Sequence, residues 1–268
     1  MRASAWVRIP VPRPAASARL FCLPFAGGSA SFYRPWCHHL KESIEVCLIQ
    51  PPGREDRHTE PAYTHSQTIV EALITQIGPF LDRPFALYGH SLGALLAFET
   101  ARALRAADLP EPSVLFLGAH RAPHLPMMRR VFYNLPDDEL LAEIKHLNGT
   151  PSAILEDSEM LRYWLPIMRA DLQICDTYEF AEALPLRCTI IANAGSGDQA
   201  ASPECMQDWR EHTTGAFALH IFPGGHFFLR TAQDSLFGIL ERYMGELPSH
   251  PLRPPEARGA AGRLHSGE

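Results

Sequence analysis

The stretch Leu87–Leu104, which reads LYGHSLGALLAFETARAL, places one serine, Ser91, between Gly89 and Gly93. An apolar run, PFALY (84–88), overlaps its start and is typical of a short buried strand. The residues after Ser91 are mostly good helix formers. A strand that turns directly into a helix makes a sharp turn, in which glycine avoids the clashes of larger side chains. The stretch therefore predicts a strand–turn–helix with the Ser91 hydroxyl exposed at its tip.

The composition limits the class of protein. The 268 residues are 46% hydrophobic and 20% charged, which fits one large domain with a well-filled core. The net charge of −6 argues against a nucleic-acid partner. The six cysteines form no C-x-x-C pair and no zinc spacing, so we expect no metal site. Prolines interrupt the N-terminal segment, and no apolar run reaches the roughly 18 residues of a membrane span, so we expect a cytoplasmic protein without a membrane segment.

Apolar runs suited to buried strands recur along the chain, near Leu20, Leu48, Leu115, Ile190 and His220. Helical patterns separate the early runs, as at 65–80 and 92–107. Strands that alternate with helices indicate βαβ units, and hence an α/β domain whose mostly parallel sheet is flanked by helices. We assign this domain to residues 15–246.

The alternation breaks between Pro123 and Leu184, a stretch with helical pattern and no convincing strand. We predict an inserted helical lid over about 123–184. Unbranched methionines can repack around different ligands, so several apolar residues there are suited to a mobile wall: Met127, Met128, Leu165 and Met168. The alternative is a fixed helical layer of the same domain. The tail, 247–268, is rich in proline, glycine and charge, and we expect it to be disordered.

A serine nucleophile needs a general base, and the base needs an acid that orients it. In a parallel sheet, such groups come from loops at the carboxyl ends of strands. Of the thirteen histidines, His226 is the best candidate base, because it follows the last predicted strand after a pair of glycines. Asp198 ends the flexible loop AGSGD (194–198) after another strand, and is the candidate acid. Asp208 is its nearest rival, and a turn or capping role for Asp198 is the alternative.

Chemistry at an acyl carbon also needs N–H donors for the negative oxygen of the tetrahedral intermediate. The backbone N–H of Leu92, next to Ser91, is one candidate. The backbone N–H of Ala26 is the other, because Ala26-Gly27-Gly28 follows an early strand and lets the backbone approach a ligand closely. A phosphate-binding loop is the alternative, but AGGSAS (26–31) lacks the P-loop lysine and the third glycine of dinucleotide folds, so we expect no cofactor.

Five segments together resemble a type II thioesterase: PFAGGSASFYRPW (24–36), PPGREDR (51–57), YGHSLGALLAFE (88–99), RADLQICDTYEF (169–180) and PGGHFFL (223–229). Such enzymes are stand-alone members of the α/β-hydrolase fold that accompany polyketide synthases and nonribosomal peptide synthetases. The resemblance covers roughly residues 21–240. It implies a serine hydrolase that removes unwanted acyl groups from the phosphopantetheine arm of acyl or peptidyl carrier proteins. We further expect a monomer.

Carried over residue by residue, the resemblance assigns Ser91 as nucleophile, Asp198 and His226 as its partners, and Ala26 and Leu92 as oxyanion donors. Three further positions are less clear from the motifs. Arg54 matches a characteristic position and either forms an ion pair within its loop or contacts substrate. Asp171 matches a structural position in the lid. His120 stands where a different polar residue is expected.

Two other functions fit the same residues. An acyltransferase or a general carboxylesterase would use the same nucleophile, base and acid, and would differ in acceptor and pocket. A non-catalytic protein that only binds acyl carriers is the third hypothesis. A binding protein has no need for Ser91, Asp198 and His226 together, which favours an enzyme.

Overall fold

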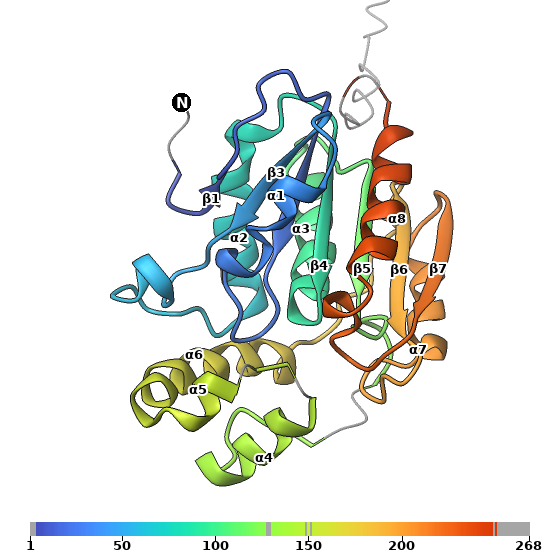
Figure 1. Ribbon diagram of the computed structural model, residues 1–268. Helices are drawn as coiled ribbons and strands as arrows, with labels where there is room; N and C mark the ends of the chain where they lie inside the picture. The colour runs from blue at the N-terminus through green and yellow to red at the C-terminus, as the bar shows by residue number, and fades with distance from the viewer. Residues whose placement is uncertain (1–3, 127–129, 148, 151, 249, 251–268) are drawn as a thin grey trace, which may run out of the picture.

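The computed structural model describes residues 4–126, 130–147, 149–150, 152–248 and 250. Within these residues, seven strands form one sheet in the order β1-β3-β2-β4-β5-β6-β7 (Figure 1). All neighbouring strands are parallel except β1, which pairs antiparallel with β3. The strands are β1 (Val7–Arg8), β2 (Ala18–Leu23), β3 (Ile44–Ile49), β4 (Phe85–His90), β5 (Val114–Gly118), β6 (Thr189–Gly195) and β7 (Phe217–Phe222). The predicted α/β class and parallel sheet are confirmed.

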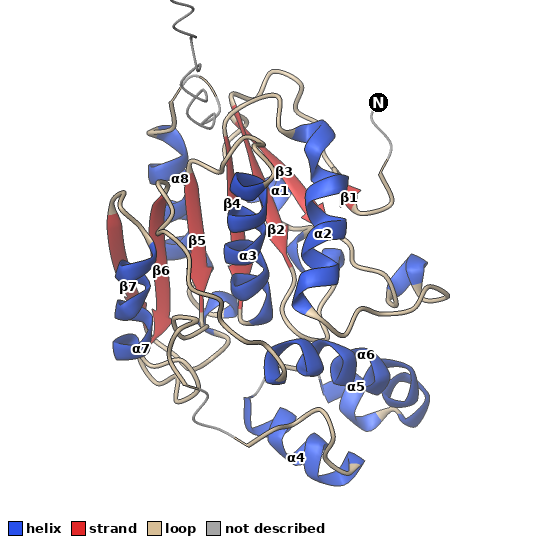
Figure 2. Cartoon of the chain, turned by 180° about the vertical axis from the view of Figure 1, so that it is seen from behind, coloured by secondary structure: helices blue, strands red, loops and turns tan. Residues whose placement is uncertain are grey.

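Helices cover both faces of the sheet. The helices α2 (Ser66–Ile77) and α3 (Leu92–Ala106) lie on one face (Figure 2), and α1 (Trp36–His39) and α8 (Gln233–Gly245) lie on the other (Figure 1). Every residue of β2, β3, β4 and β5 is therefore buried, which explains why these strands are mostly apolar in sequence.

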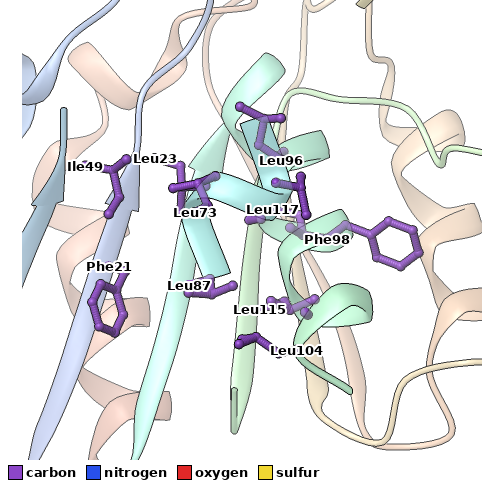
Figure 3. Close-up of a cluster of buried hydrophobic side chains, with 14 of the residues drawn as sticks. Phe21, Leu23, Ile49, Leu73, Leu87, Leu96, Phe98, Leu104, Leu115 and Leu117 are labelled. Atoms are coloured by element: carbon purple, nitrogen blue, oxygen red, sulfur yellow. The ribbon is translucent and has the colours of Figure 1, made fainter. Parts of the chain in front are cut away.

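The side chains of β2 alternate between two cores. Phe21 and Leu23 of β2 pack with residues of α2 and α3 in one core (Figure 3), whereas Leu20 and Cys22 pack into the other, which includes α1 and α8. Short elements complete this body: η1 (Ala30–Tyr33), η2 (Glu55–Arg57), η3 (Gly78–Phe80), α7 (Pro203–Gln207), η4 (Asp208–His212) and η5 (Phe228–Arg230).

The chain between β5 and β6 forms α4 (Asp137–Leu147), α5 (Ser152–Glu156) and α6 (Ser158–Asp176). In both views these helices lie together at one end of the sheet (Figures 1 and 2). The described residues of this segment contain no strand. They have their own apolar cluster, formed by Phe132, Leu140, Ile144, Trp164, Leu165, Met168 and Leu172. Ile174, near the end of α6, belongs instead to the core beneath α3.

The strand arrangement brings several loops to the end of the sheet that faces this helical segment. Because β2 to β7 are parallel, their carboxyl ends share one edge, and the loops after β2, β4, β6 and β7 meet there. Over the described residues, the structure has no helix of sufficient length and apolarity to cross a membrane.

Candidate active site

Ser91 lies in the turn between β4 and α3, with φ of 54° and ψ of −122°. This left-handed φ is uncommon for a residue with a side chain, and the flanking glycines explain how the turn is packed. A Cβ on Gly89 would lie 1.9 Å from the carbonyl oxygen of Gly93, and one on Gly93 would lie 2.4 Å from that of Leu23. The Ser91 N–H donates to the Gly118 carbonyl at 2.8 Å, which joins the turn to the end of β5. Both glycines are therefore required by close backbone contact.

The structure brings Ser91, His226 and Asp198 together in one chain of contacts. The Nε2 atom of His226 lies 3.1 Å from Ser91 Oγ, and its Nδ1 atom lies 2.9 Å from Asp198 Oδ2. Because a carboxylate only accepts, Nδ1 carries the proton and Nε2 presents its lone pair to the Ser91 hydroxyl. The other Asp198 oxygen, Oδ1, accepts the N–H groups of Ala200 and Ala201 at 2.9 and 3.1 Å. The acid is thus fixed by its own loop.

Glycines also determine how closely the loops carrying these two side chains approach. A Cβ on Gly195, at the end of β6, would lie 2.3 Å from the Gly225 carbonyl oxygen. The Gly197 N–H donates to the Gly224 carbonyl at 2.8 Å, and Gly224 has φ of 123°. The glycine-rich sequences before Asp198 and His226 are what allow their side chains to meet.

His90, inside the G-H-S-L-G motif, contributes a contact that sequence reasoning missed. Its ring is fully buried, and Nε2 lies 2.8 Å from the backbone carbonyl of His226. A carbonyl only accepts, so Nε2 carries the proton. Burial lowers the pKa of His90 well below the ordinary value, which keeps the ring neutral. His90 therefore fixes the backbone of the residue whose ring contacts Ser91.

The two predicted oxyanion donors lie at the same edge of the sheet as Ser91. Ala26 follows β2, whose last residue, Leu23, pairs with Gly89 of β4. Ala26 and Ser91 line a common cavity. Leu92 is the first residue of α3, where backbone N–H groups have no partner within the helix.

Two cavities meet at His226. The first, of about 300 Å³, contains Ser91 and His120, and its wall is largely apolar: Phe25, Phe32, Phe132, Ile144, Trp164 and Met168. The second, of about 1000 Å³, lies beside Asp198. His226, Phe227 and Arg230 line both. Of the predicted lid residues, Met168 lines the first cavity and Leu165 packs in the cluster behind it, whereas Met127 and Met128 lie outside the described residues.

Arg54 was expected either to form an ion pair within its own loop or to contact substrate, and the described residues show neither. Arg54 forms a buried ion pair with Asp171 of α6, and in the described part of the chain neither residue lines the two cavities. The pair thus joins two segments that are distant in sequence, which is why the loop sequence alone did not predict it.

The described residues contain no group of three or more His, Cys, Asp or Glu side chains that could bind a metal ion.

A sequence model of the thioesterase domain matches residues 18–244. The chain belongs to the thioesterase family. The thioesterase is 42% identical over 215 residues to the gramicidin S biosynthesis protein GrsT of Aneurinibacillus migulanus, covering 80% of this chain and 84% of that one.

Two solved structures are similar to this thioesterase along most of its length. RedJ, a thioesterase from the prodiginine biosynthetic pathway of Streptomyces coelicolor, is 36% identical with a TM-score of 0.81, covering 87% of this chain and 91% of that one. The type II thioesterase BorB, from the borrelidin biosynthetic cluster, is 33% identical with a TM-score of 0.82, covering 91% and 98%. The resemblance to type II thioesterases and the α/β-hydrolase fold are confirmed.

Proposed function

We propose that this thioesterase hydrolyses acyl thioesters with Ser91 as nucleophile, His226 as general base and acid, and Asp198 as the group that orients His226. The observation that carries the proposal is the hydrogen-bonded chain from Ser91 Oγ through the His226 ring to Asp198, at the wall of an apolar cavity. A hydroxyl with an adjacent base is activated as a nucleophile, and the carboxylate stabilises the imidazolium that forms.

In the first half of the reaction, Ser91 Oγ attacks the thioester carbon and its proton passes to His226 Nε2. The tetrahedral intermediate collapses, the carbon–sulfur bond breaks, and the leaving thiolate takes the proton from His226. In the second half, His226 removes a proton from water, which attacks the acyl-serine. The second tetrahedral intermediate then collapses, the bond from the acyl carbon to Ser91 Oγ breaks, Oγ takes the proton back from His226, and the carboxylic acid is released.

The negative oxygen of each tetrahedral intermediate needs donors that already point at it. The backbone N–H groups of Ala26 and Leu92 are our candidates. Their support is the position of Leu92 at the start of α3, and that of Ala26 in the cavity that contains Ser91.

The substrate that we propose is an acyl group on the phosphopantetheine arm of an acyl or peptidyl carrier protein. GrsT, RedJ and BorB are each connected by name with a biosynthetic pathway or cluster, which favours a role in editing polyketide or nonribosomal peptide assembly. The smaller apolar cavity suits the acyl chain, and the larger one leaves room for the arm. An acyltransferase or carboxylesterase could use the same three side chains, but the relatives are thioesterases.

Intact-mass measurement of a panel of acylated carrier proteins tests this function. We expect loss of the acyl mass and appearance of the free thiol, with no loss when Ser91→Ala is used. A simple oxygen ester of the same acyl group is the comparison. Faster turnover of the ester than of every carrier-bound thioester, or transfer of the acyl group to an added acceptor, would contradict the proposal.

A further inference from the structure

The ion pair between Arg54 and Asp171 is almost completely buried, with side chains 5% and 2% exposed. Arg54 directly precedes η2, in the loop after β3, and Asp171 lies in α6. Arg54 Nη1 lies 2.7 Å from Asp171 Oδ2, and Nη2 lies 2.8 Å from Oδ1. This two-bond arrangement of guanidinium and carboxylate restricts the relative position of the two side chains more than a single hydrogen bond does. It fixes one helix of the insertion against the loop that follows β3.

The same side chains contact the backbone beside Ala26. Asp171 Oδ2 accepts the Gly27 N–H at 2.8 Å, and Arg54 Nη1 donates to the Gly28 carbonyl at 2.9 Å. Trp164, also in α6, donates its Nε1–H to the Gly27 carbonyl at 3.0 Å. Gly27 has φ of 71°, and a Cβ there would lie 2.8 Å from Trp164 Cζ2. Both peptide groups of Gly27 and the carbonyl of Gly28 are thus fixed by side chains from elsewhere in the chain.

Stability alone is a weak reason for such a pair. Replacing a buried ion pair with apolar residues of similar volume is often neutral or stabilising, because the charges lose their hydration. The pair instead fixes the orientation of the backbone at Gly27 and Gly28. The Gly27 N–H belongs to the peptide that follows Ala26, so its direction fixes the ψ angle of Ala26. An oxyanion donor must lie within about 2.7–3.1 Å of the oxygen that it stabilises.

We propose that Arg54 and Asp171 are positioning residues for thioester hydrolysis: their ion pair fixes the Ala26–Gly28 backbone so that the Ala26 N–H points at the oxyanion. The inference rests on the proposed function, because it needs an oxyanion at Ser91. It also makes α6 part of the oxyanion geometry, although α6 belongs to the helical insertion.

Asp171→Asn is the first test, because it keeps the shape of the side chain and removes the charge. Glu45→Gln is a matched control. Glu45 pairs with Arg19 at 2.7 Å with side chains 5% and 8% exposed, and both lie near the amino ends of β3 and β2, opposite the site. Both variants should lower the melting temperature. Only Asp171→Asn should lower kcat for a small acyl thioester, by about 10- to 100-fold, with KM within about twofold.

Binding of a medium-chain trifluoromethyl ketone gives a readout that a purely structural role would not change. Ser91 Oγ adds to the ketone carbon, its proton passes to His226, and the carbonyl π electrons become the alkoxide. This adduct has an oxyanion, whereas the corresponding trifluoromethyl carbinol has no carbonyl for Ser91 Oγ to attack and forms none. Asp171→Asn should weaken binding of the ketone by about the same factor as kcat and leave inhibition by the carbinol unchanged.

Arg54→Lys covers the case in which Asp171→Asn does not fold. Lysine retains the charge but not the planar fork, so it cannot bond both Asp171 oxygens and the Gly28 carbonyl. We expect kcat to fall at least several-fold, again at constant KM. A folded Asp171→Asn or Arg54→Lys variant with the kcat and ketone affinity of the wild type would overturn the positioning role. Retained activity of Ser91→Ala would instead overturn the proposed function.

Discussion

Two regions face each other across Ser91 and are constructed differently. One is the sheet edge formed by the carboxyl ends of the parallel strands, and the other is the helical segment α4–α6. At the edge, backbone hydrogen bonds join neighbouring loops: Ser91 to Gly118, Ser196 to Phe222 and Gly197 to Gly224, each at 2.8 Å. The helical segment instead depends on an apolar cluster, whose members Trp164 and Met168 also line the cavity. Acyl chemistry requires fixed positions, and the binding of different acyl chains requires surfaces that can repack.

Removing the nucleophile should have the largest effect of any single change at the edge. Ser91→Ala should lower kcat by about 10⁴-fold or more, because only binding and oxyanion stabilisation remain. The far-UV circular dichroism and melting temperature should stay close to those of the wild type, since the methyl group of alanine fits the same turn. Steady-state kinetics with an acyl thioester measures the loss. Activity near that of the wild type would mean that the edge does not supply the nucleophile.

Changing the acid should have the next largest effect. Asp198→Asn keeps the shape of the side chain but favours the wrong tautomer of His226, so kcat should fall by about 10⁴-fold, as in serine proteases. Asp208→Asn, which changes the nearest rival, is the matched control and should stay within about twofold of wild type. The assignment of the acid would be wrong if the two variants exchanged these results.

A change in the part of the helical segment that forms the apolar cavity wall should act on substrate choice and spare the chemistry. Met168→Trp reduces the cavity beside Ser91, so kcat/KM for long acyl chains should fall by about 10-fold or more while acetyl thioesters are little affected. The control is Met160→Trp, on the same helix, where the methionine is 47% exposed. A uniform loss for all chain lengths, with a lower melting temperature, would mean that Met168 serves only as core.

A smaller effect is expected at the pair His124 and His212, where the chain that leads into the helical segment contacts η4. His124 lies in the chain that enters the helical segment, and its Nδ1 is 2.7 Å from Nε2 of His212 in η4. Burial and then the nearby His124 and Arg102 lower the pKa of His212 from 6.5 to about 4. The exposed carboxylate of Glu211 lies with its Oε2 3.6 Å from Nε2 of His124.

The direction of the pH effect follows from this lowered pKa. Between pH 6.5 and about 4 the unfolded chain binds a proton at His212 that the folded protein does not, so stability decreases as the pH falls through this window. The melting temperature should therefore fall over that range, and His212→Gln should reduce the fall relative to the wild type. His90, whose pKa is also lowered, acts in the same direction and is present in both proteins. Equal slopes for the two proteins would exclude the contribution of His212.

Local patterns predicted the sheet edge better than the helical segment. The apolar runs gave β2 to β7, while β1 was missed because its two residues, Val7 and Arg8, carry no periodic signal. Ser91, Asp198 and His226 could be selected because each follows a strand in a recognisable turn, and strand ends converge in a parallel sheet. Their catalytic roles stay predictions, as do the limits of the lid and of the domain.

The contacts that the sequence did not indicate are those between distant segments. Arg54 and Asp171 are separated by 117 positions, and no periodicity connects them. Trp164 lies in the same helical stretch, and no sequence pattern indicates that its Nε1–H donates to the Gly27 carbonyl. His90 lies between Gly89 and Ser91, at a position to which the predicted turn assigns no role, so its contact with the His226 carbonyl had no sequence signal.

The attachment of α6 has a consequence for protein engineering by recombination. The carboxyl-terminal half of α6 contacts the main core through Ile174 and the Gly27 backbone through Asp171, whereas α4 has no such contact among the described residues. A chimera that takes α4 and α5 from a relative should therefore retain chemistry and acquire that relative's acyl-chain preference. If the exchanged segment instead ran from α4 through Asp171, Arg54 would come from one parent and Asp171 from the other. The useful boundary for exchanging specificity thus lies before α6 and not at the end of the helical segment, so that Arg54 and α6 come from the same parent.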